Sequence, residues 1–195
     1  MPSFSFVDVG RLVDRELELV VPHEKWIDSV LIACVHPLSH GDDRADRTTR
    51  ASLLEFLKLA PNGRQHATGR DTVPGYFFWM RLRPEFDPPV PMAGSISMRI
   101  GSTRDIEMYF GHIGYNVFPP ARGNHYAERS CRLLATLARA HGMHTVWITC
   151  NPDNIASRRT CERLGATLVD IVKRPPSNIL YQRGEREKCR YRWEV

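Results

Sequence analysis

Apolar residues recur along the chain at two spacings, which predict a mixture of strands and helices. Short apolar or alternating runs predict strands at 17–21, 76–83, 93–101, 112–118, 144–150, 167–172 and 187–195. Apolar residues three and four positions apart predict helices within 23–37, within 48–63, from about Arg122 to His141, and within 151–166. Because no internal repeat interrupts this order, residues 1–195 are expected to form a single mixed α/β domain.

Residues with special backbone preferences mark where the predicted elements end. Thr48 or Thr49 is the expected N-cap of the second predicted helix. Gly142 and Gly165 stand just beyond the ends of the third and fourth predicted helices. The stretch 144–150 is apolar enough to predict a strand that is buried on both faces. Loops and turns are expected between the elements, at 39–47, 62–75, 84–91 and 173–184, and a hairpin end is expected at 102–108.

Composition limits the class of protein. Of the 195 residues, 42% are hydrophobic and 25% are charged, as in a globular domain. No apolar run reaches the roughly 18 residues that a membrane span requires, and the start of the chain lacks the pattern of a secretory signal. The five cysteines include no C-x-x-C pair, which favours free thiols and a cytoplasmic protein. No residues have metal-ligand spacing, so no metal is expected.

The net charge of +5 is modestly basic. Such a charge suits a polyanionic cofactor or a nucleic acid, and it fits an ordinary solvated surface equally well. Nucleic-acid binding has one further feature in its favour, the basic segment 183–193, but that segment alternates as an edge strand would. We therefore do not expect nucleic acid as a partner.

A polar segment separates the strand at 112–118 from the long helix. It consists of Arg122, Gly123, Asn124, His125, Tyr126 and Ala127. A helix N-terminus offers unpaired N–H groups and positive potential, and Gly123 allows the backbone to approach an anion closely. The two prolines after the strand cannot continue a ladder. Free backbone groups are therefore expected at Asn116, Val117 and Phe118, although a plain strand–turn–helix connection explains the segment without a ligand.

The stretch 113–134 resembles the acetyl-CoA motif of the GNAT N-acetyltransferase superfamily, in which Arg122 and Ala127 match the two ends and His125 stands where Gly is usual. The stretch 151–166 resembles the family's asparagine-rich turn and helix. It matches at Asn154, Ser157, Glu162, Leu164 and Gly165. The resemblance covers 93–170. It implies a mixed, mostly antiparallel central sheet flanked by helices, with a splayed central strand.

The same resemblance implies acetyl-CoA as co-substrate. Its pyrophosphate would rest on the backbone N–H groups of the segment from Gly123 to Ala127, with added charge from Arg122. The pantetheine arm would follow the end of the 112–118 strand, where an N–H near Val117 would hold the thioester carbonyl. Asn154 would contact the arm, although a helix cap explains it equally well. An imidazole at His125 would face a phosphate.

Acyl transfer to an amine requires a neutral nucleophile, and deprotonating a lysine-like amine at pH 7 costs roughly 4–5 kcal/mol. His112 and, upstream, Glu107 are the candidate bases. The departing thiolate needs a proton, yet Cys161 stands where the family commonly has Tyr. Ser157, Tyr115 and water are the other candidate donors, and Ser157 or water is favoured because buried cysteines are usually inert.

These features predict an acetyl-CoA-dependent N-acetyltransferase that acts by direct transfer to an amine on a small molecule or a protein. Asp42, Asp43 and Asp46 fall on the expected acceptor side, where they would receive a cation or simply pair with nearby arginines. A homodimer is compatible with the sequence. The alternative is a non-catalytic acyl-CoA-binding or regulatory module, which the changed His125 and the missing Tyr favour.

Overall fold

The computed structural model describes residues 4–8, 10–66, 73–177, 179–182 and 184–195. The strands are β1 (Leu12–Val13), β2 (Leu17–Val20), β3 (Arg64–Gln65), β4 (Gly75–Leu82), β5 (Met92–Arg99), β6 (Ile113–Val117), β7 (Thr145–Cys150), β8 (Thr167–Lys173) and β9 (Glu187–Glu194). The helices are α1 (Ile27–Val35), α2 (Asp43–Arg47), α3 (Arg50–Leu59), α4 (Tyr126–Ala140), α5 (Ile155–Leu164) and α6 (Ile179–Gln182). No helix in these ranges is long and apolar enough to cross a membrane.

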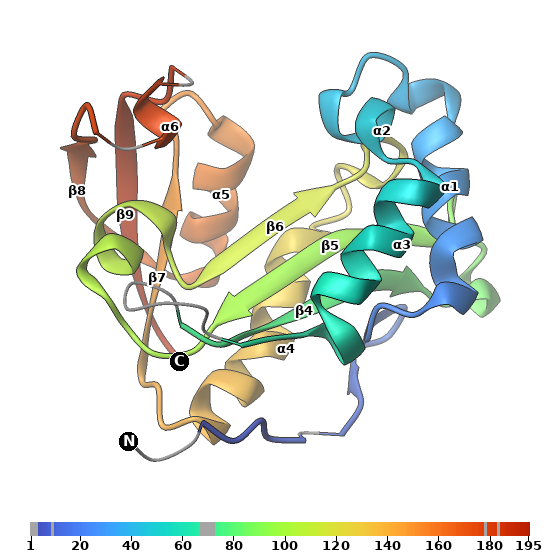
Figure 1. Ribbon diagram of the computed structural model, residues 1–195, viewed down its shortest axis with the longest axis horizontal. Coiled ribbons are helices and arrows are strands. Elements are labelled where there is room, and N and C mark those ends of the chain that lie inside the picture. Colours follow the sequence, from blue (N-terminus) through green and yellow to red (C-terminus); the bar gives the residue numbers. More distant parts are fainter. Residues whose placement is uncertain (1–3, 9, 67–72, 178, 183) are drawn as a thin grey trace.

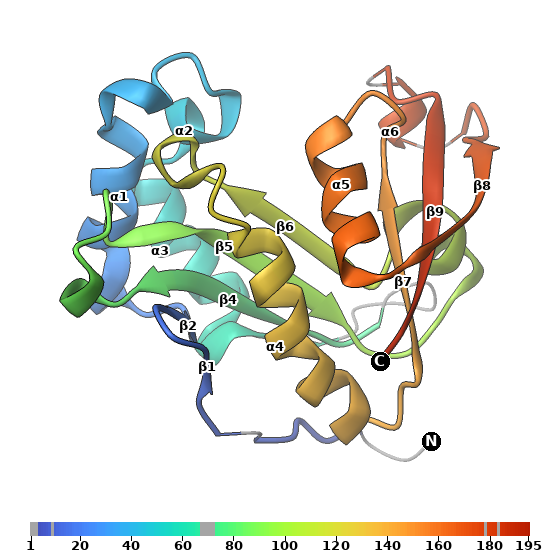
Figure 2. The same cartoon turned by 180° about the vertical axis from the view of Figure 1, so that it is seen from behind.

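The larger sheet has the order β1-β2-β4-β5-β6, with β3 on β4, and all of its ladders are antiparallel. Helices α1 to α3 cover one face and α4 covers the other (Figures 1 and 2). Because β4 lies inside this sandwich, most of its side chains are buried, which explains its dense run of apolar and aromatic residues.

The smaller sheet has the order β7-β9-β8, so the last strand of the chain lies between two earlier ones. Helix α5 packs against it and also contacts α4 (Figure 2). Strand β8 forms the outer edge and is mostly exposed. The predicted mixed fold with a mostly antiparallel sheet flanked by helices is confirmed.

The two sheets meet at one point and then diverge, which gives the splayed central strand that was predicted (Figure 1). The backbone N–H of His112 donates to the Trp147 carbonyl (2.6 Å), and the Trp147 N–H donates to His112 Nδ1 (2.9 Å). Gly111 permits this approach, since a Cβ there would lie 3.0 Å from the Trp147 carbonyl oxygen. Beyond this point no ladder joins β6 to β7 within the described residues.

Several predicted ends are confirmed by the geometry. Thr49 caps α3 and forms a reciprocal capping pair with Ser52. Asn154 caps α5 by accepting the Ser157 N–H at 3.1 Å. Gly142 and Gly165 both adopt positive φ, 71° and 81°.

The structure corrects other boundaries. Helix α4 begins at Tyr126 and not near Arg122, because Gly123 (φ +91°) and His125 (φ +58°) adopt left-handed conformations that no α-helix contains. The predicted loop 39–47 includes α2, which Asp42 caps by accepting the Ala45 N–H.

Two further segments differ from expectation. The expected hairpin end at 102–108 overlaps a π-helical turn, Ile106–Phe110. Strand β7 is fully buried on one face only, since Thr145, Trp147 and Thr149 are half-buried. The connection predicted over 62–75 includes 67–72, which lie outside the described residues.

Candidate active site

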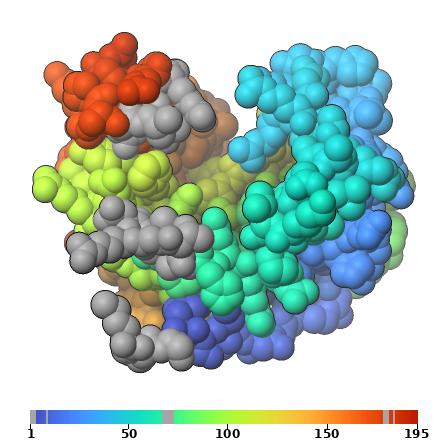
Figure 3. All heavy atoms as spheres, in the orientation of Figure 1, coloured from blue at the N-terminus to red at the C-terminus, as the bar shows by residue number. Residues whose placement is uncertain are grey.

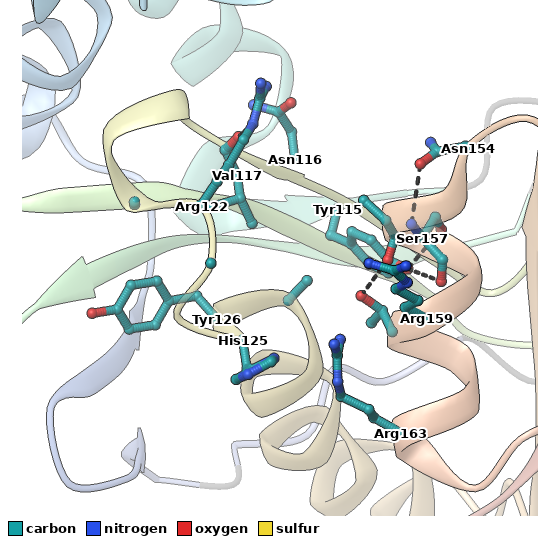
Figure 4. Close-up of a pocket in the computed structure, with 15 residues that line it drawn as sticks. Tyr115, Asn116, Val117, Arg122, His125, Tyr126, Asn154, Ser157, Arg159 and Arg163 are labelled. Atoms are coloured by element: carbon teal, nitrogen blue, oxygen red, sulfur yellow. Dashed lines mark hydrogen bonds between the residues drawn. The ribbon is translucent and has the colours of Figure 1, made fainter. Parts of the chain in front are cut away.

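A cleft of about 540 Å³ lies between β6, α4 and α5, beside the divergence of the sheets (Figure 4); we call it the α4–α5 cleft. Its lining includes ten of the predicted site residues: Tyr115, Asn116, Val117, Arg122, Gly123, His125, Tyr126, Ala127, Asn154 and Ser157. Five others lie outside this lining: Glu107, His112, Phe118, Asn124 and Cys161.

The start of α4 has a row of unpaired donors, and four of the five residues that carry them line the cleft. Within the described residues, no recorded hydrogen bond engages the backbone N–H groups of residues 123–127, whereas the Arg122 N–H donates to Pro119 and the Arg129 N–H to His125. These five N–H groups lie at the positive end of a 15-residue helix. The arrangement is that of an anion-binding site.

His125 shows why the related motif usually has Gly at this position. Its φ of 58° and ψ of 22° are left-handed, a region that Gly enters freely and His enters at a cost of about 1–2 kcal/mol. The backbone path of the loop is therefore kept although the residue differs, and the imidazole is added to the cleft wall.

Arg122 faces a partner that the sequence did not reveal. Its Nε donates to the Val117 carbonyl (3.1 Å), and its Nη2 pairs with Asp42 Oδ2 (2.5 Å), so it joins the cleft loop to α2. Burial opposes ionisation of Asp42, but the Ala45 N–H and the Arg122 guanidinium outweigh it and lower the Asp42 pKa. The predicted contact of Arg122 with a pyrophosphate stays a prediction.

Arg159 and Arg163 line the cleft from α5, opposite the loop at 122–127 (Figure 4), and the sequence reasoning missed both. They stand four positions apart, and such residues share one face of a helix. That spacing, just after the Asn154 cap, was the available signal. They add two guanidinium groups to the cleft wall, besides that of Arg122, which is paired with Asp42.

The register of β6 decides which of its backbone groups face the splay. The Phe118 N–H donates to Ala93 (2.8 Å), and the His112 carbonyl accepts from Arg99 (2.8 Å). Because hydrogen-bonded pairs alternate in antiparallel ladders, even-numbered residues of β6 bond to β5 and odd-numbered ones face the splay. The prediction of free backbone groups is therefore corrected for Asn116 and Phe118, while the Val117 N–H points toward the open side.

Two hydroxyl groups close the inner end of the cleft. Tyr115 reaches across from β6, and its phenol oxygen lies 2.7 Å from Ser157 Oγ on α5 (Figure 4). Burial raises the pKa of Tyr115 far above its usual value, so the phenol keeps its proton at neutral pH. The Asn154 cap fixes the first turn of α5 and thereby the position of Ser157.

Cys161 is fully buried behind the cleft wall. Burial, reinforced by the nearby Cys150, raises its pKa to about 12, so it remains a protonated thiol. All five cysteines of the chain are free and buried. The structure thus places Cys161 in the core, outside the lining of the cleft.

His112 is placed at the junction of the two sheets, 2% exposed. Burial lowers its pKa to about 4. Because Nδ1 accepts from Trp147, the neutral ring carries its proton on Nε2, and neither nitrogen offers a free lone pair. Glu107 lies on the π-helical turn, where its carboxylate accepts from Ser102. Both candidate bases therefore lie outside the lining of the α4–α5 cleft.

A second cavity of about 340 Å³ opens on the face of the sheet that carries α2 and α3; we call it the α2–α3 pocket. That face is hollowed between these helices (cyan to teal) and the segment near residues 100–110 (yellow-green) in Figure 3. Asn116 lines both this pocket and the α4–α5 cleft, so the two cavities approach each other at β6. Of the three predicted acceptor-side carboxylates, Asp43 alone lines the pocket.

The described residues include no group of three or more His, Cys, Asp or Glu side chains that could hold a metal ion.

A family model described as an acetyltransferase (GNAT) domain matches residues 42–167. The chain belongs to the GNAT acetyltransferase family. The match includes α2, the whole lining of the α4–α5 cleft, the lining of the α2–α3 pocket except Val30, and the whole of α5. Among curated proteins, none matches this GNAT chain by sequence.

Solved structures share the fold of this GNAT domain at low sequence identity. The microcin C7 self-immunity acetyltransferase MccE, in complex with acetyl-CoA and AMP, is 15% identical with a TM-score of 0.65, over 93% of this chain and 94% of that one. RimL, a ribosomal L7/L12 alpha-N-protein acetyltransferase in complex with coenzyme A, is 17% identical with a TM-score of 0.64, over 95% and 98%. A GCN5-related N-acetyltransferase from Brucella melitensis is 15% identical with a TM-score of 0.65, over 97% and 80%.

Proposed function

We propose that this GNAT domain transfers an acetyl group from acetyl-CoA directly to an amine, as an N-acetyltransferase. One observation carries the proposal. Four of the five residues with unpaired N–H groups at the start of α4, namely Gly123, His125, Tyr126 and Ala127, line the same cleft as the Tyr115–Ser157 hydroxyl pair. The cleft thus offers an anion-binding site at one end and a proton donor at the other, which match the phosphates and the thioester of acetyl-CoA.

The described residues fit the parts of acetyl-CoA in order along the cleft. The backbone at 123–127 suits the pyrophosphate, and Arg159 and Arg163 add positive charge for the remaining phosphate. The Val117 N–H, turned toward the splay, suits the thioester carbonyl, where it would stabilise the oxyanion that forms on attack. RimL and MccE are structures with coenzyme A and acetyl-CoA respectively, which supports this assignment.

The hydroxyl pair supplies the proton for the departing thiolate. Because the Tyr115 phenol stays protonated, it can donate to Ser157 Oγ, which leaves the serine proton free for the cleft. The amine attacks the carbonyl carbon, the C–S bond breaks, and the CoA sulfur takes the Ser157 proton. Water takes the amine proton, because His112 is withdrawn from the cleft, and returns a proton to Ser157, so that both hydroxyl groups are protonated again after the transfer.

Turnover of three variants tests the proton donor. Ser157→Ala should lower kcat at least about tenfold while CoA affinity changes little, since one charge-assisted hydrogen bond to the developing thiolate is lost. Tyr115→Phe should lower kcat by a smaller factor. Cys161→Ala should leave kcat near wild type, and a hundredfold loss there with intact folding would reverse the assignment.

A non-catalytic acyl-CoA-binding module is the second candidate, because His125 and Cys161 replace the usual Gly and Tyr of the motif. Such a module would bind CoA and release none from acetyl-CoA with any amine. Calorimetric CoA binding together with a screen of amines for CoA release separates the two candidates.

A further inference from the structure

The α2–α3 pocket combines an aromatic floor with charged groups at one end only. Phe56, Phe77 and Trp79 form the floor, and the rings of Phe56 and Phe77 lie 4.5 Å apart between centroids. Every ionisable side chain in the lining comes from α2: Asp43, Arg44 and Arg47. An acceptor in this pocket therefore meets apolar surface along its body and charge at the α2 end.

The balance of charge at that end is positive. Arg47 pairs with Asp43 at 2.7 Å, one helical turn away. Arg44 has no carboxylate partner among the residues that the structure describes. A guanidinium without a counter-charge beside an apolar floor attracts a carboxylate or phosphate, with which it can form paired hydrogen bonds.

The opposite end of the pocket, at β6, is neutral. Ser95 and Asn116 line it, and the Asn116 Nδ2 is buried without a hydrogen-bond partner among the described residues. An ammonium ion at this end would lose its water without gaining a carboxylate, which favours the neutral amine. Neutral amine is the form that attacks a thioester.

Building on the proposed function, we propose that the acceptor is a small primary amine with an apolar or aromatic body and an anionic group at its far end. The amine lies at Asn116, beside the thioester, and the anionic group lies at Arg44. A volume of about 340 Å³ is near the lower end of ligand pockets, which fits a body about the size of one ring. Arg44 is thus a specificity-determining residue that binds the acceptor away from the reacting atoms.

Two probe amines that differ only at the far end test this class: 4-(2-aminoethyl)benzoate and 4-(2-aminoethyl)benzamide. The ring and two methylene groups separate the amine from the carboxylate or amide group, so the pKa of the amine is similar in both probes. We expect kcat/KM to be at least about tenfold higher for the benzoate, as a charge-assisted pair implies. In Arg44→Gln this preference should fall below about twofold, while CoA affinity stays unchanged.

Arg50→Gln is the matched control, because Arg50 also lies near α2 but pairs with Asp28 outside the pocket. It removes the same charge and should keep the tenfold preference. Equal kcat/KM for the two probes in the wild type, or a preference that survives Arg44→Gln, overturns the acceptor class while acetyl transfer stands.

Failure of the proposed function gives a different result, namely no CoA release with any amine. Calorimetric binding then decides the acceptor class separately, with each probe added to the CoA complex. Tighter binding of the benzoate than of the benzamide, lost in Arg44→Gln but kept in Arg50→Gln, supports it. Equal binding, or none, overturns it.

Discussion

His112→Asn separates a structural role of this histidine from a catalytic one. In the wild type, His112 Nδ1 accepts the Trp147 N–H where the two sheets meet. An asparagine places a carbonyl oxygen close to the same position, so the hydrogen bond is kept, but it cannot take up a proton at Nδ1. The variant should therefore fold at neutral pH and keep its turnover within about twofold, since no proton passes through His112.

The magnitude of the pH effect follows from the shifted pKa. Burial chiefly lowers the His112 pKa from 6.5 to about 4. Between these values the unfolded chain binds a proton that the folded chain does not, so the free energy of unfolding decreases as the pH falls. At about 1.36 kcal/mol per unit, the loss reaches about 3 kcal/mol by pH 4. Above pH 6.5 both states hold a neutral ring and the loss vanishes.

Urea unfolding at pH values from 7 to 4.5 measures this loss. Carboxylates with lowered pKa values, such as Asp14 and Asp42, also lose stabilising interactions in acid, but they do so equally in both proteins. The difference between wild type and variant therefore isolates His112. Relative to its value at pH 7, the difference in the free energy of unfolding should shift by about 2 kcal/mol in favour of the variant at pH 5. Parallel curves over the whole range, or a hundredfold loss of kcat at pH 7, would refute the reasoning.

Three further predictions concern the cleft. Asn124→Pro removes one backbone donor and should weaken CoA binding at least about tenfold by calorimetry, whereas Asn124→Ala should change it less than threefold; equal effects would contradict backbone recognition. His125→Gly should raise the free energy of unfolding by up to about 1 kcal/mol in urea titrations, because the left-handed strain is relieved; destabilisation would contradict this. Arg159→Ala and Arg163→Ala should each weaken the binding of CoA about tenfold more than the binding of dephospho-CoA, which lacks one phosphate. Arg139→Ala, at the far end of α4, is the control. Equal losses for both ligands would mean that the two arginines do not contact that phosphate.

Local rules predicted much of the site. The Asn154 cap, the glycine ends of α4 and α5, and the donors at 123–127 each depend on a few neighbouring residues, so the sequence carried the information. The fold class followed from the order of strands and helices together with the family resemblance.

Long-range packing hid the rest. Arg122 and Asp42 stand 80 positions apart, and Tyr115 and Ser157 stand 42 apart, so no local pattern pairs them. The late start of α4 depends on a histidine in a conformation that propensity assigns to Gly. His112 looked like a base because its strand flanks the splay, but the Trp147 N–H occupies its lone pair.

Transfer of labelled acetyl groups tests the central proposal most directly. The protein is incubated with acetyl-CoA labelled in the acetyl carbon and a panel of amines, and label is followed in the amine, the protein and free acetate. Direct N-acetyl transfer predicts one labelled amide per CoA released and no label on the protein. Label recovered only as acetate or on the protein, or CoA binding without release, would contradict it.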